Sequence, residues 1–119
     1  MATIAHTTVK NDITGGWAGT VIAVWADMSQ TDDIGNVFEG PSLADRTVQI
    51  TGTFGGGTLR MEGSLDGVTY FTLTDLAAAA VSVTADSLVV IRELVRFIRP
   101  VLTGATAGNV KVCLLARQP

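Results

Sequence analysis

The residues able to do chemistry are few in this 119-residue chain. Its one histidine, His6, and its one cysteine, Cys113, cannot assemble an ordinary zinc site, and no internal disulfide can form. None of the serines lies in a nucleophile-elbow motif, so a Ser-His-Asp triad would have to recruit His6 from the polar start of the chain. These features argue against hydrolase chemistry and against a resident zinc ion.

Carboxylates are the remaining groups with catalytic or metal-binding potential. A glycosidase needs two of them flanking the scissile bond, and the glutamates available are Glu39, Glu62 and Glu93. One polar segment offers oxygen ligands for calcium without the fixed spacing of an EF-hand, from Asp27, Asp32 and Asp33. We expect all of these to be surface acids, and therefore a protein without an active site, a bound metal or another cofactor.

Composition indicates one compact domain. Hydrophobic residues make up 47% of the chain and charged residues 16%, which favours a packed core over disorder. No stretch approaches the ~20 apolar residues of a membrane-spanning helix, and the first residues lack the regions of a secretory signal. The net charge is -3 and the eight basic residues are scattered, which argues against nucleic acid as a partner. We expect a soluble domain that binds neither nucleic acid nor membrane.

The elements that carry these side chains have the patterns of strands. Residues 20–26 form an almost wholly apolar, β-branched run, typical of a strand covered on both faces. Further on, Val48, Ile50 and Phe54 alternate with polar residues at the period of a half-buried strand. Gly52 interrupts the apolar side of this run, where it predicts a bulge or a close backbone approach.

Turn signals divide the rest of the chain into short strands. The glycine-rich run at residues 52–57 joins two strands and is not followed by a helix, which excludes a phosphate loop. Asp66-Gly67 predicts a tight hairpin turn. Further strand candidates are residues 58–62, 69–74, 81–83, 88–91, 95–103 and 110–116. Roughly seven to nine strands with such turns are typical of sandwiches and barrels.

We therefore predict an all-β, antiparallel β-sandwich with a jelly-roll-like topology. It occupies residues 18–119 and follows an irregular N-terminal arm at residues 1–17, while residues 27–45 form a long polar loop with at most one short edge strand. Trp25 is expected in the core, and Cys113 is expected to be a partly buried strand residue.

One passage resembles a known pattern. Residues 48–74 contain a strand, a glycine turn and a hairpin of the form "G-S-x-D-G-x-x-[WY]-x-x-L", which begins at Gly63. Residues 95–104 and the closing strand at residues 109–116 are similar to the end of the same kind of protein. These segments cover less than half of the chain, which thereby resembles the capsid decoration, or cement, proteins of tailed bacteriophages.

The resemblance implies a virion structural protein on the outer surface of the capsid, made in the host bacterial cytoplasm. It would stabilise the head by bridging subunits of the major capsid protein, and protection of its edge strands favours a homodimer or homotrimer. We expect contacts from the N-terminal arm, from the 27–45 loop and from arginines near the strand at residues 95–103. The candidate contact residues are Ile4, His6, Val9, Trp17, Ile34, Val37, Phe38, Arg92, Arg96 and Arg99.

Two alternatives stay open. A phage tail, adsorption or carbohydrate-binding sandwich would present Trp17 and Tyr70 to solvent as a stacking platform. A small glycosidase would place two carboxylates about 5–10 Å apart in a cleft.

Overall fold

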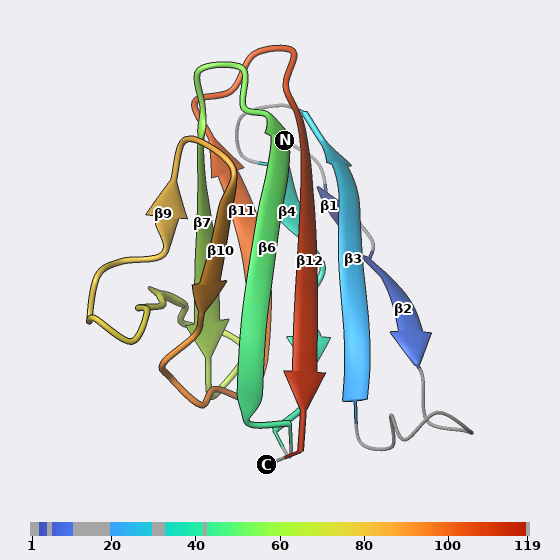
Figure 1. The fold of residues 1–119 in the computed structure, drawn as a ribbon, viewed down its shortest axis with the longest axis vertical. Helices are drawn as coiled ribbons and strands as arrows, with labels where there is room; N and C mark the ends of the chain where they lie inside the picture. Colours follow the sequence, from blue (N-terminus) through green and yellow to red (C-terminus); the bar gives the residue numbers. More distant parts are fainter. Residues whose placement is uncertain (1–2, 5, 11–19, 30–32, 42, 119) are drawn as a thin grey trace.

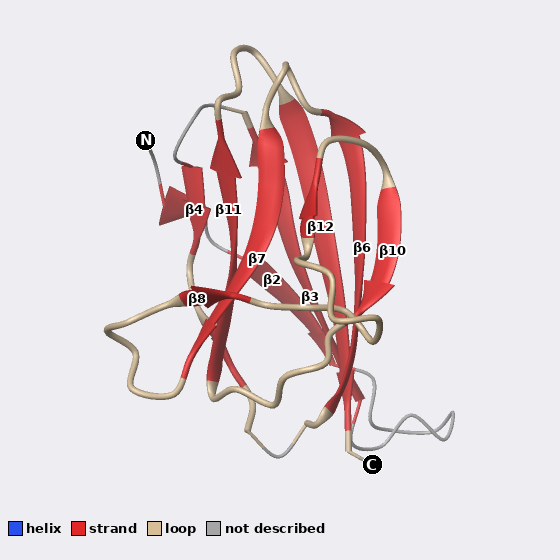
Figure 2. Cartoon of the chain, turned by 90° about the vertical axis from the view of Figure 1, so that its left-hand side faces the viewer, coloured by secondary structure: helices blue, strands red, loops and turns tan. Residues whose placement is uncertain are grey.

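The described part of the chain is built of strands and contains no helix (Figure 1). The computed structural model describes residues 3–4, 6–10, 20–29, 33–41 and 43–118. No helix long and apolar enough to cross a membrane occurs in these ranges. Two sheets pack face to face around one core, as Figure 2 shows from the side. The all-β sandwich predicted from the sequence is confirmed.

Each sheet combines strands that are distant in the sequence. The strands are β1 (Thr3–Ile4), β2 (His6–Lys10), β3 (Thr20–Met28), β4 (Asp33–Gly35), β5 (Phe38–Glu39), β6 (Asp45–Thr53), β7 (Thr58–Ser64), β8 (Phe71–Thr72), β9 (Ser82–Val83), β10 (Ser87–Val90), β11 (Phe97–Thr103) and β12 (Asn109–Arg117). One sheet has the order β10-β6-β12-β3-β2. The other has the order β1-β4-β11-β7-β8, with β5 also paired to β11 and β9 to β7. All the pairings are antiparallel except that of β1 with β4.

The core follows from the two-residue period of the long strands. Along β12, Val110, Val112, Leu114 and Ala116 are buried, and the residues between them are exposed or half-buried. Val48 and Ile50 contribute the same kind of inner face from β6, as the sequence pattern predicts. The strands predicted around residues 69–74 and 81–83 are shorter in the structure, because β8 and β9 pair with different parts of β7.

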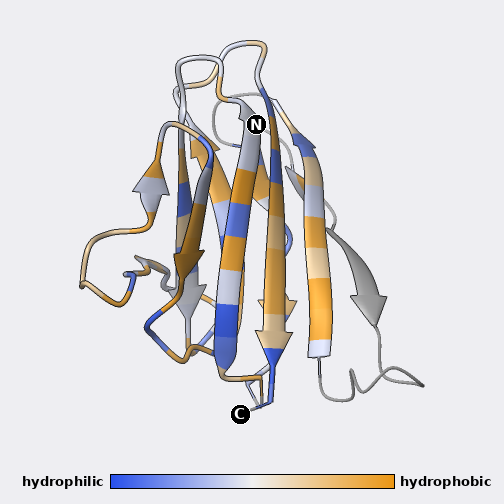
Figure 3. Ribbon diagram, viewed as in Figure 1, coloured by the Kyte–Doolittle hydropathy of each residue, from blue (hydrophilic) through white to orange (hydrophobic). Residues whose placement is uncertain are grey.

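The apolar run in β3 differs from its prediction. Ala23 and Trp25 are fully buried, but Ile22 and Val24 on the opposite face are only half-buried. Figure 3 shows β3 and β12 as largely hydrophobic along their lengths, whereas β6 alternates. The strand lies between β12 and β2 and is internal to its sheet, but the described residues cover only one of its faces.

The expectation of an irregular N-terminal arm is wrong for the described part of residues 1–17. β1 pairs with β4, and β2 adds to the free edge of β3 from His6↔Trp25 to Lys10↔Val21. The physical reason is that β3 would otherwise be an unprotected edge strand, whose amides and carbonyls need partners. The rest of the predicted arm lies outside the described residues.

The 27–45 segment is also more ordered than predicted. Its first residues complete β3, and it then forms the short strands β4 and β5, both of which pair with β11. The indole Nε1 of Trp25 donates to the backbone oxygen of Asn36 at 3.0 Å, and Asp33 accepts a hydrogen bond from the Ser29 amide at 2.9 Å. These contacts attach the segment to the sandwich, which polar composition alone did not indicate.

Arg46 is a buried cation at the start of β6. Its Nε donates to the Leu43 carbonyl at 2.9 Å and its Nη2 to the Gly40 carbonyl at 2.8 Å. Burial lowers the pKa of its guanidinium from the ordinary arginine value. Because both acceptors belong to the connection that leads into β6, the side chain ties that connection to the core.

Candidate functional site

The site is built on the hairpin that follows β7. The Asp66 carboxylate accepts hydrogen bonds from the Val68 amide at 2.8 Å, the Thr69 amide at 3.0 Å and the Ser64 hydroxyl at 2.8 Å. Gly67 has a φ of 77°, the left-handed conformation that the Asp-Gly pair predicts. The bonds from Thr69, Val68 and Ser64 lower the pKa of Asp66, so the carboxylate that organises the turn stays ionised.

This ordered turn presents apolar side chains to solvent. Leu65 is 70% exposed, Val68 82% and Phe71 69%. We call these three residues the hairpin patch. Large apolar side chains that are exposed close together, in a turn and in the strand after it, indicate a surface that binds another molecule. Left uncovered, such side chains lower the solubility of the protein.

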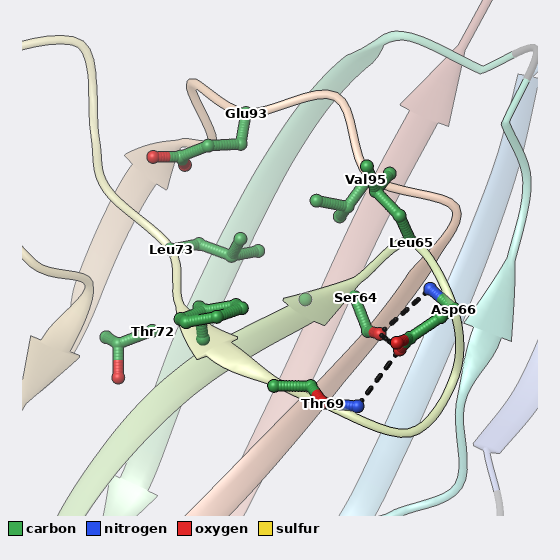
Figure 4. Close-up of a pocket in the computed structure, with 10 residues that line it drawn as sticks. Ser64, Leu65, Asp66, Thr69, Thr72, Leu73, Glu93 and Val95 are labelled. Carbon is green, nitrogen blue, oxygen red and sulfur yellow. Dashed lines mark hydrogen bonds between the residues drawn. The ribbon is translucent and has the colours of Figure 1, made fainter.

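A pocket of about 350 Å³ lies between the hairpin and residues 93–95 (Figure 4). Its lining residues are Gly63, Ser64, Leu65, Asp66, Thr69, Phe71, Thr72, Leu73, Glu93 and Val95. Gly63 lets two walls of the pocket pack against its backbone, because a Cβ there would lie 2.6 Å from Val95 Cγ2 and 2.7 Å from Leu73 Cδ2. The pocket is mainly apolar, and its volume suits a large side chain or a small ring.

Glu93 fixes the far side of the pocket. Its carboxylate accepts hydrogen bonds from the Thr74 amide at 2.8 Å and from the Thr74 hydroxyl. Partial burial alone would raise the pKa of Glu93, but the Thr74 bonds and the positive charge of Arg92 hold it below the ordinary glutamate value. The 91–95 connection is thereby fastened to the chain that follows β8.

Two carboxylates, Asp66 and Glu93, therefore line one pocket, as a glycosidase would require. A general acid in such a pair needs a raised pKa so that it holds a proton. Both carboxylates here have lowered pKa values and are held by hydrogen-bond donors. Both carboxylates therefore have structural hydrogen-bond partners, and the absence of enzymatic activity stays a prediction.

The predicted contact arginines differ in their surroundings. Arg99 pairs with Glu62 at 3.1 Å and lies over the Tyr70 ring at 3.7 Å from its centroid. Arg96 pairs with Glu39 at 2.6 Å. Both arginines therefore have an acidic partner within the chain, which is the alternative to a partner contact, and Arg99 shares Glu62 with Arg60. Arg92 is exposed beside Glu93.

The apolar contact candidates are also dispersed. Ile4 is half-buried against the core and Ile34 is half-buried in β4, whereas Val37 is exposed. Phe38 is a correction: its ring is buried in the core, since β5 pairs with β11 over the sandwich interior. His6 and Val9 belong to β2, but their side chains, like Trp17, lie outside the described residues.

Sequence reasoning missed the hairpin patch. The sequence does contain an indication of it. Turns usually consist of polar residues, glycine and proline, yet Leu65, Val68 and Phe71 lie in or next to this one. It also placed Tyr70 among the open aromatics, whereas the structure half-buries it beneath the Arg99 guanidinium. Within the described ranges, no group of three or more His, Cys, Asp or Glu side chains is arranged to hold a metal ion.

The fold and the site define a small two-sheet β-sandwich with an apolar pocket and an apolar hairpin at its surface. No protein-family model and no curated protein sequence matches the chain. Among solved structures, it is similar to the SPBc2 prophage-derived protein YomS, at 10% identity and a TM-score of 0.63, over 89% of this chain and 99% of that one. It is also similar to the PBSX exported protein XepA, at 12% identity and a TM-score of 0.65. That match covers 91% of this chain but 44% of XepA, and identities this low show the fold alone.

Proposed function

We propose that the chain is a phage structural protein that binds the outside of the head and stabilises the capsid by bridging major capsid protein subunits. Three lines of support converge on this function. The hairpin sequence resembles that of capsid decoration proteins, the fold is shared with YomS, whose name describes it as prophage-derived, and the surface carries apolar contact groups.

The observation that carries the proposal is the hairpin patch beside its pocket. The turn is held by the Asp66 hydrogen bonds, so little conformational entropy is lost when a partner covers it. Burying a Leu or Phe side chain contributes about 1.5–3 kcal/mol. Such a contact is weak by itself, but many copies on one shell add through avidity and stabilise the assembled state that they bind.

The test is co-sedimentation of the recombinant protein with expanded capsids that lack it. We expect saturable binding at a fixed copy number per capsid subunit, and at least a tenfold weaker binding for Phe71→Ser. Leu76→Ser is the matched control, because Leu76 is equally exposed but lies in the 75–80 connection. Absence of pelleting with assembled capsids would refute head binding, and equal loss with both variants would refute the role of the hairpin patch.

A carbohydrate-binding or tail adsorption module is the second candidate, and the pocket lining favours it. An exposed aromatic ring, Phe71, stands beside the hydroxyls of Ser64, Thr69 and Thr72, which is a combination that suits a sugar ring. This function predicts binding to host-surface oligosaccharides that is lost in Phe71→Ser, together with density on the tail and none on the head of the virion.

A further inference from the structure

On the four strands of the five-stranded sheet whose side chains are described, β3, β12, β6 and β10, the centre of the outer face lacks the polar coat that an exposed antiparallel sheet normally has. Its central residues are Ile22 and Val24 of β3, Cys113 and Leu115 of β12, Thr47 and Gln49 of β6, and Leu88 and Val90 of β10. Leu88 is 71% exposed, and Val90 and Leu115 are exposed as well. A shallow hollow of about 350 Å³ lies among six of these residues. We call this set the outer apolar face.

Strand register makes the outer apolar face continuous. Leu115 lies opposite Ile22 on one side and Thr47 on the other, and Val90 lies opposite Thr47. Cys113 begins the second row in the same way, because its partners are Val24 and Gln49, and Gln49 faces Leu88. Residues directly opposite in an antiparallel pair project from the same side of the sheet. The two rows therefore form one patch across β3, β12, β6 and β10.

Among the described side chains, none of those in the two rows is charged. Arg117 and Asp45 pair with each other at 2.9 Å at one end, and Lys111 lies at the other end of β12, opposite Thr51. At the β10 edge, Asp75 lines a separate hollow together with Leu88 and Val90. The polar members of the patch, Thr47 and Gln49, are neutral. A charged partner would therefore lose solvation on this face without gaining a counter-charge.

We propose that the outer apolar face binds a second copy of this chain. The apolar pattern of β3 is that of a strand covered on both sides, yet the described sandwich covers only one. A neutral patch is complementary to itself, so one surface used twice about a two-fold axis supplies both halves of the interface. Two sheets stacked about 10 Å apart repeat the packing that already holds the sandwich together.

The size of the face sets the strength of the pair. Four strands about 4.8 Å apart, with two rows that occupy about four residues of each strand at about 3.3 Å per residue, span roughly 250 Å². This is about a third of the ~800 Å² that each partner buries in a standard stable interface. The dimer is therefore weak and depends on protein concentration, which makes its loss easy to detect.

Sedimentation equilibrium of the purified protein over a wide concentration range tests the proposal. We expect a reversible monomer–dimer equilibrium, and association at least tenfold weaker for Leu88→Lys, because the variant buries an unpaired charge. Leu65→Lys is the matched control, since Leu65 is 70% exposed but lies in the hairpin that follows β7 of the other sheet. Circular dichroism checks the fold of each variant, and Val90→Lys replaces Leu88→Lys if the latter does not fold.

Cys113 supplies an independent readout. Its thiol lies in the middle of the outer apolar face, so dimerisation should slow its modification by a maleimide as protein concentration rises, and Leu88→Lys should remove that dependence. A monomer at every concentration with a constant labelling rate would overturn the proposal. So would a dimer that Leu65→Lys weakens and Leu88→Lys leaves intact. No capsid enters these experiments, so the proposed head-binding function and this dimer can fail separately.

Discussion

Replacing Gly52 by alanine is expected to remove a large part of the stability of this domain. Gly52 lies near the end of β6 opposite Val110 and has a φ of 127°, a conformation that is essentially restricted to glycine. A Cβ at this position would overlap the carbonyl oxygen of Asn109 and lie 3.2 Å from the Cα of Val110. Both obstacles are backbone atoms of the neighbouring strand, so they cannot move aside as a flexible side chain would.

The magnitude follows from these two costs. Backbone strain of this kind costs about 1–3 kcal/mol, and separating β6 from β12 weakens ladder hydrogen bonds that contribute about 0.5–1.5 kcal/mol each. The sum is about 3 kcal/mol out of a total stability of roughly 5–15 kcal/mol. At about 2.1 cal/mol/K per residue over 119 residues, this corresponds to a fall in Tm of about 12 °C.

Urea denaturation followed by circular dichroism measures the effect, with Gly56→Ala as the matched control. Gly56 also has a positive φ, of 80°, but a Cβ there meets no atom within 4 Å. The control should therefore lose only about 1 kcal/mol, the ordinary cost of the left-handed conformation. If the two variants lose the same stability, the close approach of β6 and β12 at Gly52 is not what restricts this position.

Three further predictions concern the core, the pocket and its rim. Trp25→Phe should lower the free energy of unfolding, measured in urea, by about 1–3 kcal/mol, because it leaves a cavity and removes the Nε1 donor to Asn36. An unchanged midpoint of unfolding would contradict a buried, hydrogen-bonded indole. Glu93 has a folded-state pKa below its unfolded value near 4.3, so its stabilising contribution is present above that pH and is lost as pH falls through the folded pKa. The difference in unfolding free energy between the native protein and Glu93→Gln should accordingly be constant above about pH 5 and shrink at lower pH, whereas a pH-independent difference would exclude the linkage. Phe71→Ser should weaken capsid binding while leaving the thermal midpoint within about 2 °C, since its ring is mostly exposed; a large stability loss would indicate a core role instead.

Local patterns predicted many of the elements and missed the features that depend on partners elsewhere in the chain. The alternation of Val48 and Ile50, the core position of Trp25 and the Asp-Gly turn at residue 66 are properties of a few neighbouring residues, and the structure confirms them. By contrast, β2 forms a strand because β3 offers it a free edge. The polar composition of residues 6–10 does not indicate that they pair with the edge of β3.

The candidate site shows the same division. A turn around Asp66 was predictable, but its apolar side chains form a pocket only because Glu93 and Val95 come alongside from a distant segment. The partner of Arg99 could not be read from the sequence, because the pairing of β11 with β7 places it beside Glu62. The polar composition of residues 27–45 predicted an accessible Phe38, but β5 pairs with β11 and the Phe38 ring is buried.

By itself, the amino-acid sequence determined the long strands with an alternating pattern, the glycine at the tight approach and the fact that the chain has one histidine and one cysteine, because these depend on residue type and on spacing along the chain. Only the tertiary structure decided which apolar faces are covered, which charges are paired and where a pocket opens. Those properties depend on strand order, and strand order places β12 between β3 and β6 and leaves the outer apolar face uncovered by the described residues. Many pairs of strands could form a ladder with similar local propensity and pattern. Which strands pair is therefore decided by the packing of the whole domain.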